Sequence, residues 1–264
     1  TIVIGAGSGL STAAGYTYSG ERFERYFGDF IEKYRFTDMY TGSFYLFPSL
    51  EEYWAWWSRQ IYYNRYVDPP KDVYLKLLKL VEKKGYFVIT TNVDHAFQRA
   101  GFDKNRLFYT QGDYGLLQCS EPCHETTYDN EMLVMEMMKE QKEMKIPSEL
   151  IPYCPRCKKP MKMNLRADQS FAQDKGWYKA KEGFEAFIQK HGDKKILLLE
   201  LGVGHNTPVW IKYPFWNLTE KNRKAFYVCM NQEEAYVPPQ IKDRSLLLTE
   251  EIGKVFDDLY EVMM

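Results

Sequence analysis

Four of the five cysteines stand in two close pairs, and thiolates can act as nucleophiles or as metal ligands. Cys119 pairs with Cys123, and Cys154 follows after 30 intervening residues and pairs with Cys157. Two short chelating loops that carry four thiolates suit tetrahedral Zn²⁺. A closed four-thiolate site leaves no position for a substrate, so such sites are structural. We therefore expect a zinc ion that serves folding, with unligated or redox-active thiols as the alternative.

A glycine-rich turn follows the first apolar run of the chain. The segment Gly5-Ala-Gly-Ser-Gly9 comes directly after Ile4, which is typical of a strand that leads through a tight turn into a helix. Glycines let the backbone approach a ligand, and a helix start offers unpaired N–H groups to a phosphate. The same glycines are also compatible with a purely geometric role. The turn departs from Gly-x-Gly-x-x-Gly, and no acidic strand end follows about 20 positions later, which disfavours an ordinary NAD dehydrogenase.

Three further apolar runs end in small or amide residues. They are followed along the chain by Thr91-Asn-Val-Asp94, by Gly202-Val-Gly204 and by Asn231. Such residues leave room for a ligand and offer it hydrogen bonds. A polar ligand could therefore contact these three loops and the glycine turn together, provided that the fold places them at one edge.

Strands and helices must position these loops. We expect strands at 1–4, 86–90, 107–109, 196–201 and 225–230, and helices at 21–36, 51–66, 71–84 and 249–263. Gly85 is expected to close the helix 71–84. Alternating strands and helices predict an α/β fold with a Rossmann-like parallel sheet. Ligands of such sheets bind beyond the carboxyl ends of the strands, where the strand order reverses.

The alternating pattern is interrupted between residues 113 and 165. This segment contains the cysteine pairs, several prolines and a polar segment expected to be helical at 130–145. We therefore expect a small zinc-binding module at 113–165, inserted into a nucleotide-binding domain formed by 1–112 and 166–264.

Composition excludes several classes of partner. The net charge of −1 gives no general attraction to nucleic acid, and the apolar runs are far too short to span a bilayer. The chain opens directly on an apolar run without a basic leader, so we expect a soluble cytoplasmic protein. The abrupt start also leads us to expect that a preceding segment has been trimmed. No nucleic-acid or membrane partner is expected.

The remaining candidate residues receive a structural interpretation. The four histidines lack the spacing of metal ligands, and Cys229 lies inside an apolar run that is typical of a buried strand. The aromatic stretch 53–57 is interpreted as core or as a partner groove, with a hydrophobic acyl site as the alternative.

The motifs occur in a fixed order through nearly the whole chain. They are Gly5-Ala-Gly7, 90–94, Gln111-Gly112, the two cysteine pairs, Gly202-x-Gly204 with Asn206, and Asn231. This ordered set resembles the sirtuins, which use NAD as a co-substrate. The resemblance implies NAD contacts for a set of small and polar residues: Gly5, Ala6, Gly7, Ser8, Leu10, Asn92, Asp94, Gln111, Gly202, Gly204, Asn206 and Asn231.

Three of these residues correspond to the catalytic positions of sirtuins. In that family the Asn and Asp of a Thr-Gln-Asn-x-Asp motif hold the nicotinamide ribose and the carboxamide, and a histidine before glycine is the general base. The resemblance therefore implies catalytic roles for Asn92, Asp94 and Gln111.

The departures from the usual sirtuin pattern are specific. Gln111 stands in the place of the histidine, Thr91 replaces the motif glutamine, and 9–15 replaces the Pro-Asp-Phe-Arg stretch. Together with 163–168 these changes are similar to the microbial class M sirtuins. That branch implies mono-ADP-ribosylation of a lipoyl-carrier protein of the glycine-cleavage H type. It also implies a macrodomain partner that reverses the modification.

The chemistry of Gln111 supports the same conclusion. Deacylation needs a base that removes a proton from a ribose hydroxyl, and histidine can do so because its unperturbed pKa is ~6.5. A glutamine amide cannot take that proton, and loss of a general base typically costs ~10²–10⁴-fold in rate. ADP-ribosyl transfer ends when an external nucleophile captures C1′, so it does not need the second step.

Two alternatives remain open from the sequence. One is an NAD-dependent deacylase that acts on lipoyl-lysine or another acyl-lysine, with its base elsewhere. The other is a non-catalytic NAD-sensing scaffold, which Asn92 and Asp94 disfavour because a sensor has little use for polar groups gathered at the scissile bond.

Overall fold

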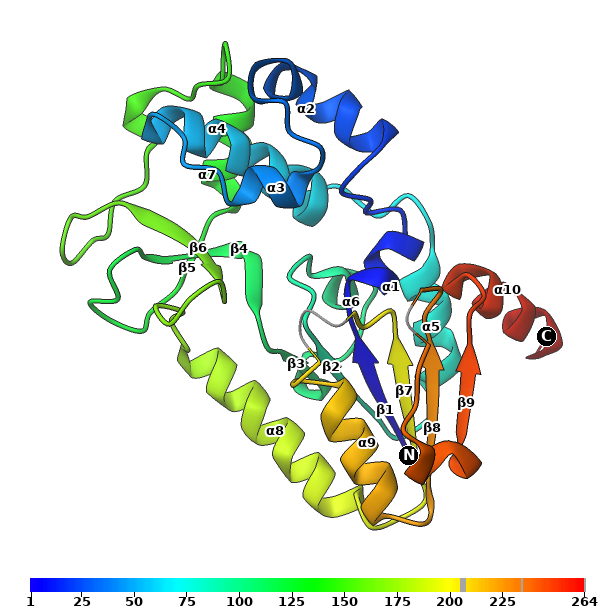
Figure 1. Cartoon of the computed structure of the whole chain (residues 1–264). Helices are drawn as coiled ribbons and strands as arrows, with labels where there is room; N and C mark the ends of the chain where they lie inside the picture. The colour runs from blue at the N-terminus through cyan, green and yellow to red at the C-terminus, as the bar shows by residue number, and fades with distance from the viewer. Residues whose placement is uncertain (205–207, 234, 264) are drawn as a thin grey trace. The chain divides into compact units, whose positions relative to one another are not determined.

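The computed structural model describes residues 1–204, 208–233 and 235–263 (Figure 1). The chain divides into two compact units. The first consists of Thr1–Gly15, Pro69–Gly112 and Lys175–Met264, and the second consists of Tyr16–Asp68 and Asp113–Asp174. This division differs from the expected one, because 16–68 joins the segment that contains the cysteines. Helices of the two stretches pack together there, which local sequence patterns do not indicate.

A six-stranded sheet forms the centre of the first unit (Figure 1). Its strand order is β3-β2-β1-β7-β8-β9, and every pair of neighbours runs parallel. The strands are β1 (Ile2–Ala6), β2 (Tyr86–Thr90), β3 (Leu107–Tyr109), β7 (Ile196–Leu201), β8 (Ala225–Met230) and β9 (Ser245–Leu248). The predicted Rossmann-like parallel sheet is therefore confirmed, and β9 is the strand of this sheet that sequence analysis missed.

Burial explains why these runs form strands. All five residues of β1 and all five of β2 are buried, as expected for central strands of a parallel sheet covered by other elements. The helices of this unit are α1 (Ser8–Ala13), α5 (Val73–Val81), α6 (Ala96–Arg99), α8 (Lys175–His191), α9 (Lys212–Lys221) and α10 (Ile252–Met263). Short 3₁₀ turns occur at Lys104–Arg106 and Pro239–Arg244.

The helices of the first unit pack on particular strands. Helix α8 contacts β2 and β3, α9 contacts β7 and β8, and α10 packs against α5. The expected amphipathic helix at the carboxyl end is α10, in which Ile252 and Phe256 are buried one turn apart. The expectation that Gly85 closes a helix is wrong. Helix α5 ends at Val81, and the Gly85 carbonyl accepts a hydrogen bond from the N–H of Ile2 (2.8 Å).

The second unit contains helices and a small sheet. Its helices are α2 (Glu21–Tyr34), α3 (Met39–Ser43), α4 (Leu50–Ile61) and α7 (Glu131–Glu140), with a π-helical turn at Tyr62–Tyr66 and a 3₁₀ turn at Ser148–Leu150. The strands β4 (Gly112–Cys119), β5 (Tyr128–Asp129) and β6 (Met161–Leu165) form a three-stranded sheet in the order β5-β4-β6. Helix α7 is shorter than the expected 130–145.

Aromatic side chains form the core of the second unit. Trp54 and Trp56 are fully buried, and Trp57 is 6% exposed. The ring of Trp56 lies 4.5 Å from that of Phe27 and 5.2 Å from that of Phe30, measured between centroids. The structural interpretation of 53–57 as core is therefore confirmed, and such rings are among the largest contributors to hydrophobic stabilisation.

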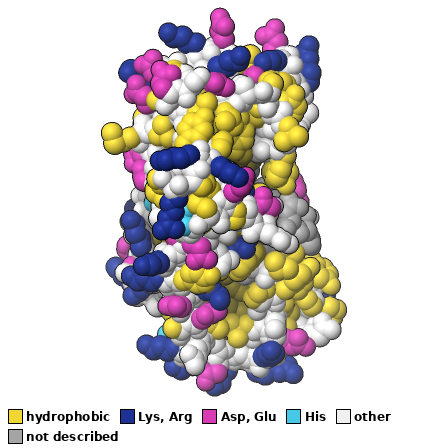
Figure 2. All heavy atoms as spheres, turned by 90° about the vertical axis from the view of Figure 1, so that its left-hand side faces the viewer, with side chains coloured by type: hydrophobic (Ala, Val, Ile, Leu, Met, Phe, Trp, Pro, Cys, Tyr) yellow, Lys and Arg dark blue, Asp and Glu magenta, His cyan; other side chains and the backbone are white. Residues whose placement is uncertain are grey.

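Two features of the described residues concern membranes and surface charge. None of the helices in the described parts of the chain is long and apolar enough to cross a bilayer. On the face drawn in Figure 2, Lys and Arg side chains lie among Asp and Glu side chains, in keeping with the net charge of −1.

Candidate functional site

The carboxyl ends of the central strands meet at one edge of the first unit. Strand β1 lies between β2 and β7, and the strand order reverses between β1 and β7. The N–H of Gly7 donates to the carbonyl of Leu201 (3.0 Å), and the N–H of Gly9 donates to the carbonyl of Gly202 (2.9 Å). The glycine turn and the loop after β7 are thus joined at the position where open α/β sheets bind ligands.

Close packing of these two loops accounts for three of the glycines. A Cβ on Gly7 would lie 2.6 Å from the carbonyl oxygen of Gly202, and a Cβ on Gly202 would lie 2.5 Å from the Cα of Gly9. Gly202 also has a φ of +59°, a conformation that L side chains rarely adopt. The N–H groups of Gly9 and Leu10 already donate to Gly202 and Gly7, so fewer amides of the first helical turn are unpaired than expected.

Asn92 is anchored to the glycine turn. Its Nδ2 donates to the carbonyl of Gly7 (2.9 Å) and also lies 3.4 Å from the hydroxyl of Tyr74. Its backbone N–H donates to Oγ1 of Thr90 at the end of β2 (3.0 Å). A backbone carbonyl can only accept, so the nitrogen of this amide must face Gly7. The side chain is therefore held in one orientation at the edge of the sheet.

Asp94 lies in the same network and is 6% exposed. One carboxyl oxygen accepts from the backbone N–H of Ala96 (3.0 Å), and the other accepts from Oγ of Ser11. Ser11 in turn lies 2.9 Å from the hydroxyl of Tyr74. Sequence analysis missed Ser11 and Tyr74. Ser11 stands just beyond the glycine turn, whereas Tyr74 occupies an ordinary buried position of a helix.

The other predicted site residues have separate positions. Gln111 follows β3 and is half-buried, and its Nε2 lies 3.4 Å from Oγ1 of Thr110. No hydrogen bond joins Gln111 to Asn92 among the described residues. Nδ2 of Asn231 donates to the carbonyl of Val203 (3.1 Å), which ties the end of β8 to the loop after β7.

The remaining predicted residues differ in exposure. Ala6 and the side chain of Leu10 are fully buried, whereas Ser8 is exposed at the start of α1. Gly204 follows the loop after β7 and is half-buried. Gly5 packs against α9, where a Cβ would lie 2.3 Å from Ile211. Asn206 lies outside the described residues.

A buried ion pair joins α9 to β7 beneath the site. Nζ of Lys212 lies 2.5 Å from Oε1 of Glu200, and the hydroxyl of Tyr227 donates to Oε2 of the same carboxylate (2.7 Å). Burial, and then the charge of Glu200, raises the pKa of the Tyr227 phenol and raises the pKa of Cys229 to about 12. Cys229 therefore remains a thiol at neutral pH, as expected for a buried structural residue.

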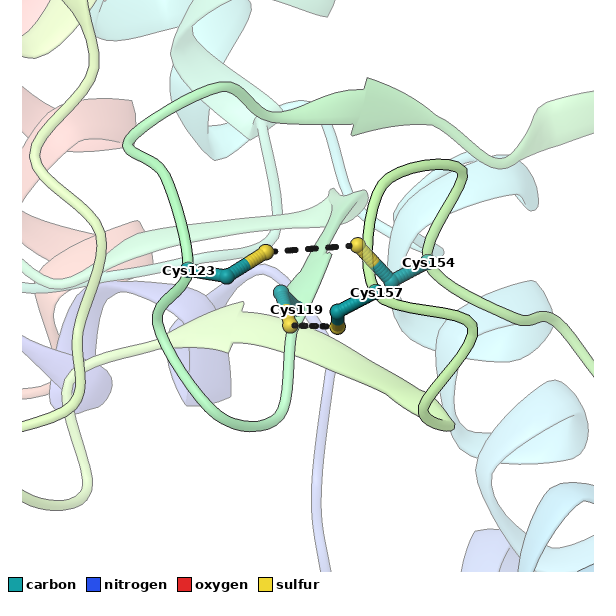
Figure 3. A group of neighbouring side chains, drawn as sticks. All are labelled: Cys119, Cys123, Cys154 and Cys157. Atoms are coloured by element: carbon teal, nitrogen blue, oxygen red, sulfur yellow. Dashed lines mark hydrogen bonds between the residues drawn. The ribbon is translucent and has the colours of Figure 1, made fainter.

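The four paired cysteines converge in the second unit (Figure 3). Their sulfurs all lie within 4.8 Å of one another, with Sγ of Cys119 3.4 Å from that of Cys157 and Sγ of Cys123 3.6 Å from that of Cys154. Zn–S bonds of ~2.3 Å at tetrahedral angles place sulfurs ~3.8 Å apart. The thiols are free rather than joined as disulfides. The four cysteines therefore fit a tetrahedral zinc ion.

Comparison with solved structures identifies the fold. The structure of Sir2Tm bound to a propionylated peptide aligns with a TM-score of 0.58 and 18% identity, covering 99% of this chain and 92% of that one. The crystal structure of a Sir2 homologue–NAD complex aligns with a TM-score of 0.59 and 16% identity, covering 99% and 88%. No family model matches the chain. The fold is that of the sirtuins.

Curated relatives identify the family. A protein ADP-ribosyltransferase of Staphylococcus aureus is 45% identical over 253 residues, which cover 96% of this chain and 80% of that protein. A probable bifunctional ADP-ribose hydrolase/ADP-ribosyltransferase of Fusarium oxysporum is 30% identical over 93% of this chain, which spans only 42% of the fungal protein. The chain belongs to the sirtuin-type protein ADP-ribosyltransferases, and the resemblance that its ordered motifs indicated is confirmed.

Proposed function

We propose that this protein is an NAD-dependent mono-ADP-ribosyltransferase, which transfers ADP-ribose from NAD to a protein acceptor and releases nicotinamide. The observation that carries the proposal is the anchored amide of Asn92, which lies on the glycine turn beside the buried Asp94. NAD supplies an electrophilic C1′ and a leaving group, so the protein needs chiefly to bind and orient. The 45% identical ADP-ribosyltransferase supports this activity.

The proposal assigns two groups of residues to NAD. The first binds the dinucleotide along the loops at the carboxyl edge and consists of Gly5, Ala6, Gly7, Ser8, Leu10, Gly202, Gly204, Asn206 and Asn231. Contacts from buried Ala6 and Leu10 must come from their backbone atoms, because their side chains are enclosed. The second group, Asn92, Asp94 and Gln111, holds the ribose and the nicotinamide at the reacting end.

The amide of Gln111 distinguishes transfer from deacylation. Glutamine can donate or accept a hydrogen bond with the ribose but cannot accept a proton from it at neutral pH. In the proposed reaction the bond from C1′ to nicotinamide breaks, and a nucleophile of the acceptor forms the new bond to C1′. The proton of that nucleophile passes to solvent or to the acceptor, so no histidine is required.

The proposed acceptor is a lipoyl-carrier protein of the glycine-cleavage H type. This assignment rests on the resemblance to class M sirtuins. A macrodomain protein that removes ADP-ribose is the proposed second partner. Its support is the Fusarium relative, whose name combines an ADP-ribose hydrolase with an ADP-ribosyltransferase.

The proposed zinc ion is structural. Cys119, Cys123, Cys154 and Cys157 would hold it, and four thiolate ligands leave no open position for water or substrate. The ion would link the end of β4 to the turn that precedes β6, and it would take no part in the transfer.

Two parallel incubations test the function. The protein is mixed with NAD labelled in its adenylate phosphate, with a lipoylated carrier protein and, separately, with an acyl-lysine peptide. Label on the carrier is the expected result. Formation of O-acyl-ADP-ribose would establish the deacylase instead, and NAD that stays intact with both acceptors would contradict both enzymatic functions.

A further inference from the structure

A continuous chain of four polar side chains lies behind the proposed reacting end. It runs from Nδ2 of Asn92 to the hydroxyl of Tyr74 (3.4 Å), on to Oγ of Ser11 (2.9 Å), and from there to Oδ2 of Asp94. These residues come from three separate segments, namely α1, α5 and the stretch after β2. Tyr74 is 1% exposed, Ser11 7% and Asp94 6%, so bulk water does not compete for these hydrogen bonds.

The chemistry of the groups sets the direction of each hydrogen bond. A carboxylate accepts only, so the single proton of Ser11 goes to Asp94. The oxygen of Ser11 must then accept from the phenol of Tyr74. The phenol oxygen is left as an acceptor, and an N–H of Asn92 faces it. All three links therefore point the same way, from the amide towards the carboxylate.

This direction determines which atom Asn92 offers to a ligand. One amide hydrogen goes to the carbonyl of Gly7 (2.9 Å) and the other faces Tyr74. No described residue donates to Oδ1 of Asn92, and the residue is half-buried. The atom that Asn92 has available for a ribose hydroxyl is therefore its acceptor oxygen.

We propose that Ser11 and Tyr74 are positioning residues, which act through Asn92 and Asp94 and hold both in the orientation needed to cleave NAD. This inference rests on the proposed function. A chain of buried hydroxyls stabilises a particular arrangement only when every member is paired, and removal of one member leaves its neighbour unsatisfied. Loss of the Tyr74 hydroxyl leaves one N–H of Asn92 and the acceptor oxygen of Ser11 without this partner, although the second N–H of Asn92 still donates to Gly7.

The substitution Tyr74→Phe tests the proposal with little disturbance of packing. Phenylalanine keeps the ring, which lies edge-on to Phe97 at 4.9 Å between centroids. The matched control is Tyr86→Phe. Tyr86 is 4% exposed, packs edge-on to Phe102 at 5.7 Å, and pairs its hydroxyl with the backbone N–H of Asp103 (3.2 Å) at the opposite end of β2.

Steady-state release of nicotinamide gives the kinetic result. We expect Tyr74→Phe to lower kcat about tenfold while KM for NAD changes less than about twofold, because orientation matters most in the transition state. Tyr86→Phe should stay within about twofold of the unmodified enzyme. A Tyr74→Phe enzyme that matches this control in kcat overturns the proposal.

A double variant tests whether the residues act as one unit. Ser11→Ala should lower kcat to a similar extent, and Ser11→Ala combined with Tyr74→Phe should lose little more than either change alone. If the two losses in kcat multiply, the two hydroxyls act independently. The proposal that the four side chains act as one unit would then be wrong.

A measurement without turnover separates this proposal from the proposed function. Side-chain amide hydrogen exchange of Asn92, assigned by comparison with Asn92→Asp, should be slow in the unmodified protein and faster in Tyr74→Phe. If the unmodified protein does not cleave NAD, the proposed function is wrong. The exchange result still decides whether the hydroxyls of Ser11 and Tyr74 hold Asn92 in place. Equal rates of Asn92 amide exchange in the unmodified protein and in Tyr74→Phe would overturn the positioning role of Tyr74.

Discussion

At the scale of single residues, the proposed function makes position 111 the one that determines which reaction follows the cleavage of NAD. Gln111 is half-buried after β3, and its amide cannot serve as the base that deacylation requires. Asn92, by contrast, is held on the carbonyl of Gly7, and its proposed role lies in the cleavage step that both reactions share. Substitutions at the two positions should therefore have different signatures.

Substitution of Gln111 should change the product more than the rate. We expect Gln111→His to permit some turnover of acyl-lysine peptides, because an imidazole can take the ribose proton. Gln111→Ala should lower ADP-ribosylation only moderately, through loss of a hydrogen bond of roughly 0.5–1.5 kcal/mol. Asn92→Ala should be more damaging. Chromatography of labelled products checks this, and deacetylation of ordinary acetyl-lysine peptides by the unmodified enzyme would contradict the transferase assignment.

Ser8 offers a clean test of the proposed phosphate site. A carboxylate at Ala6 would be enclosed in the core and would test folding, whereas Ser8 is exposed. Ser8→Glu should place a negative charge beside the glycine turn and weaken NAD binding at least tenfold, ~1.4 kcal/mol. Calorimetry measures the affinity, with Ser8→Ala as the neutral control. Unchanged NAD affinity in folded Ser8→Glu would contradict the proposal that the NAD phosphates bind at this turn.

At the scale of elements, the two glycine-rich loops depend on each other for packing. The backbone of Gly202 contacts that of Gly9 so closely that neither position has room for a side chain. The hydrogen bonds from Gly7 to the end of β7 and from Gly9 to the loop after it join the two halves of the sheet on either side of its reversal. The geometric interpretation of these glycines is therefore correct whether or not a phosphate binds there.

The substitution Gly202→Ala should destabilise the protein itself. A methyl group would meet the backbone of Gly9 at 2.5 Å, and φ is +59°, so we expect a loss of at least ~2 kcal/mol in the free energy of unfolding. Gly28→Ala in α2 is the control, since no atom lies within 4 Å of its added Cβ. Thermal unfolding compares them, and equal melting temperatures would contradict the packing argument.

At the scale of the whole molecule, the second unit combines an aromatic core with the four-cysteine cluster. Its small sheet has strands of eight, two and five residues. A metal ion that links the end of β4 to the turn before β6 would supply a long-range connection. Zinc sites of this kind contribute directly to folding free energy.

Removal of the zinc ligands should therefore lower stability. We expect the purified protein to carry one zinc ion, and Cys154→Ser to lower both the zinc content and the melting temperature. Cys229→Ala is the matched control, because Cys229 is buried in the first unit and should leave the zinc content unchanged. Metal analysis by mass spectrometry decides the point. An intact fold with four free thiols and no zinc would refute the structural role.

Local sequence patterns predicted five of the six strands of the parallel sheet and the family of this protein. Apolar runs bounded by glycine and amide residues marked β2, β3, β7 and β8 at their observed bounds, because a buried parallel strand needs a continuous apolar sequence. The spacing of the cysteines likewise indicated a four-thiolate site, because chelation by short loops depends on residues that are close in the sequence. The ordered motifs identified the family that the relatives confirm.

Only the tertiary structure decided which distant residues act together. Ser11 and Tyr74 join Asn92 and Asp94 through contacts between residues 63 and 83 positions apart, and no periodicity in the sequence encodes such pairings. The grouping of 16–68 with the cysteine segment likewise depends on the packing of α4 against α7. Side-chain burial and hydrogen-bond direction are properties of the folded chain, because each depends on what the fold places opposite a residue.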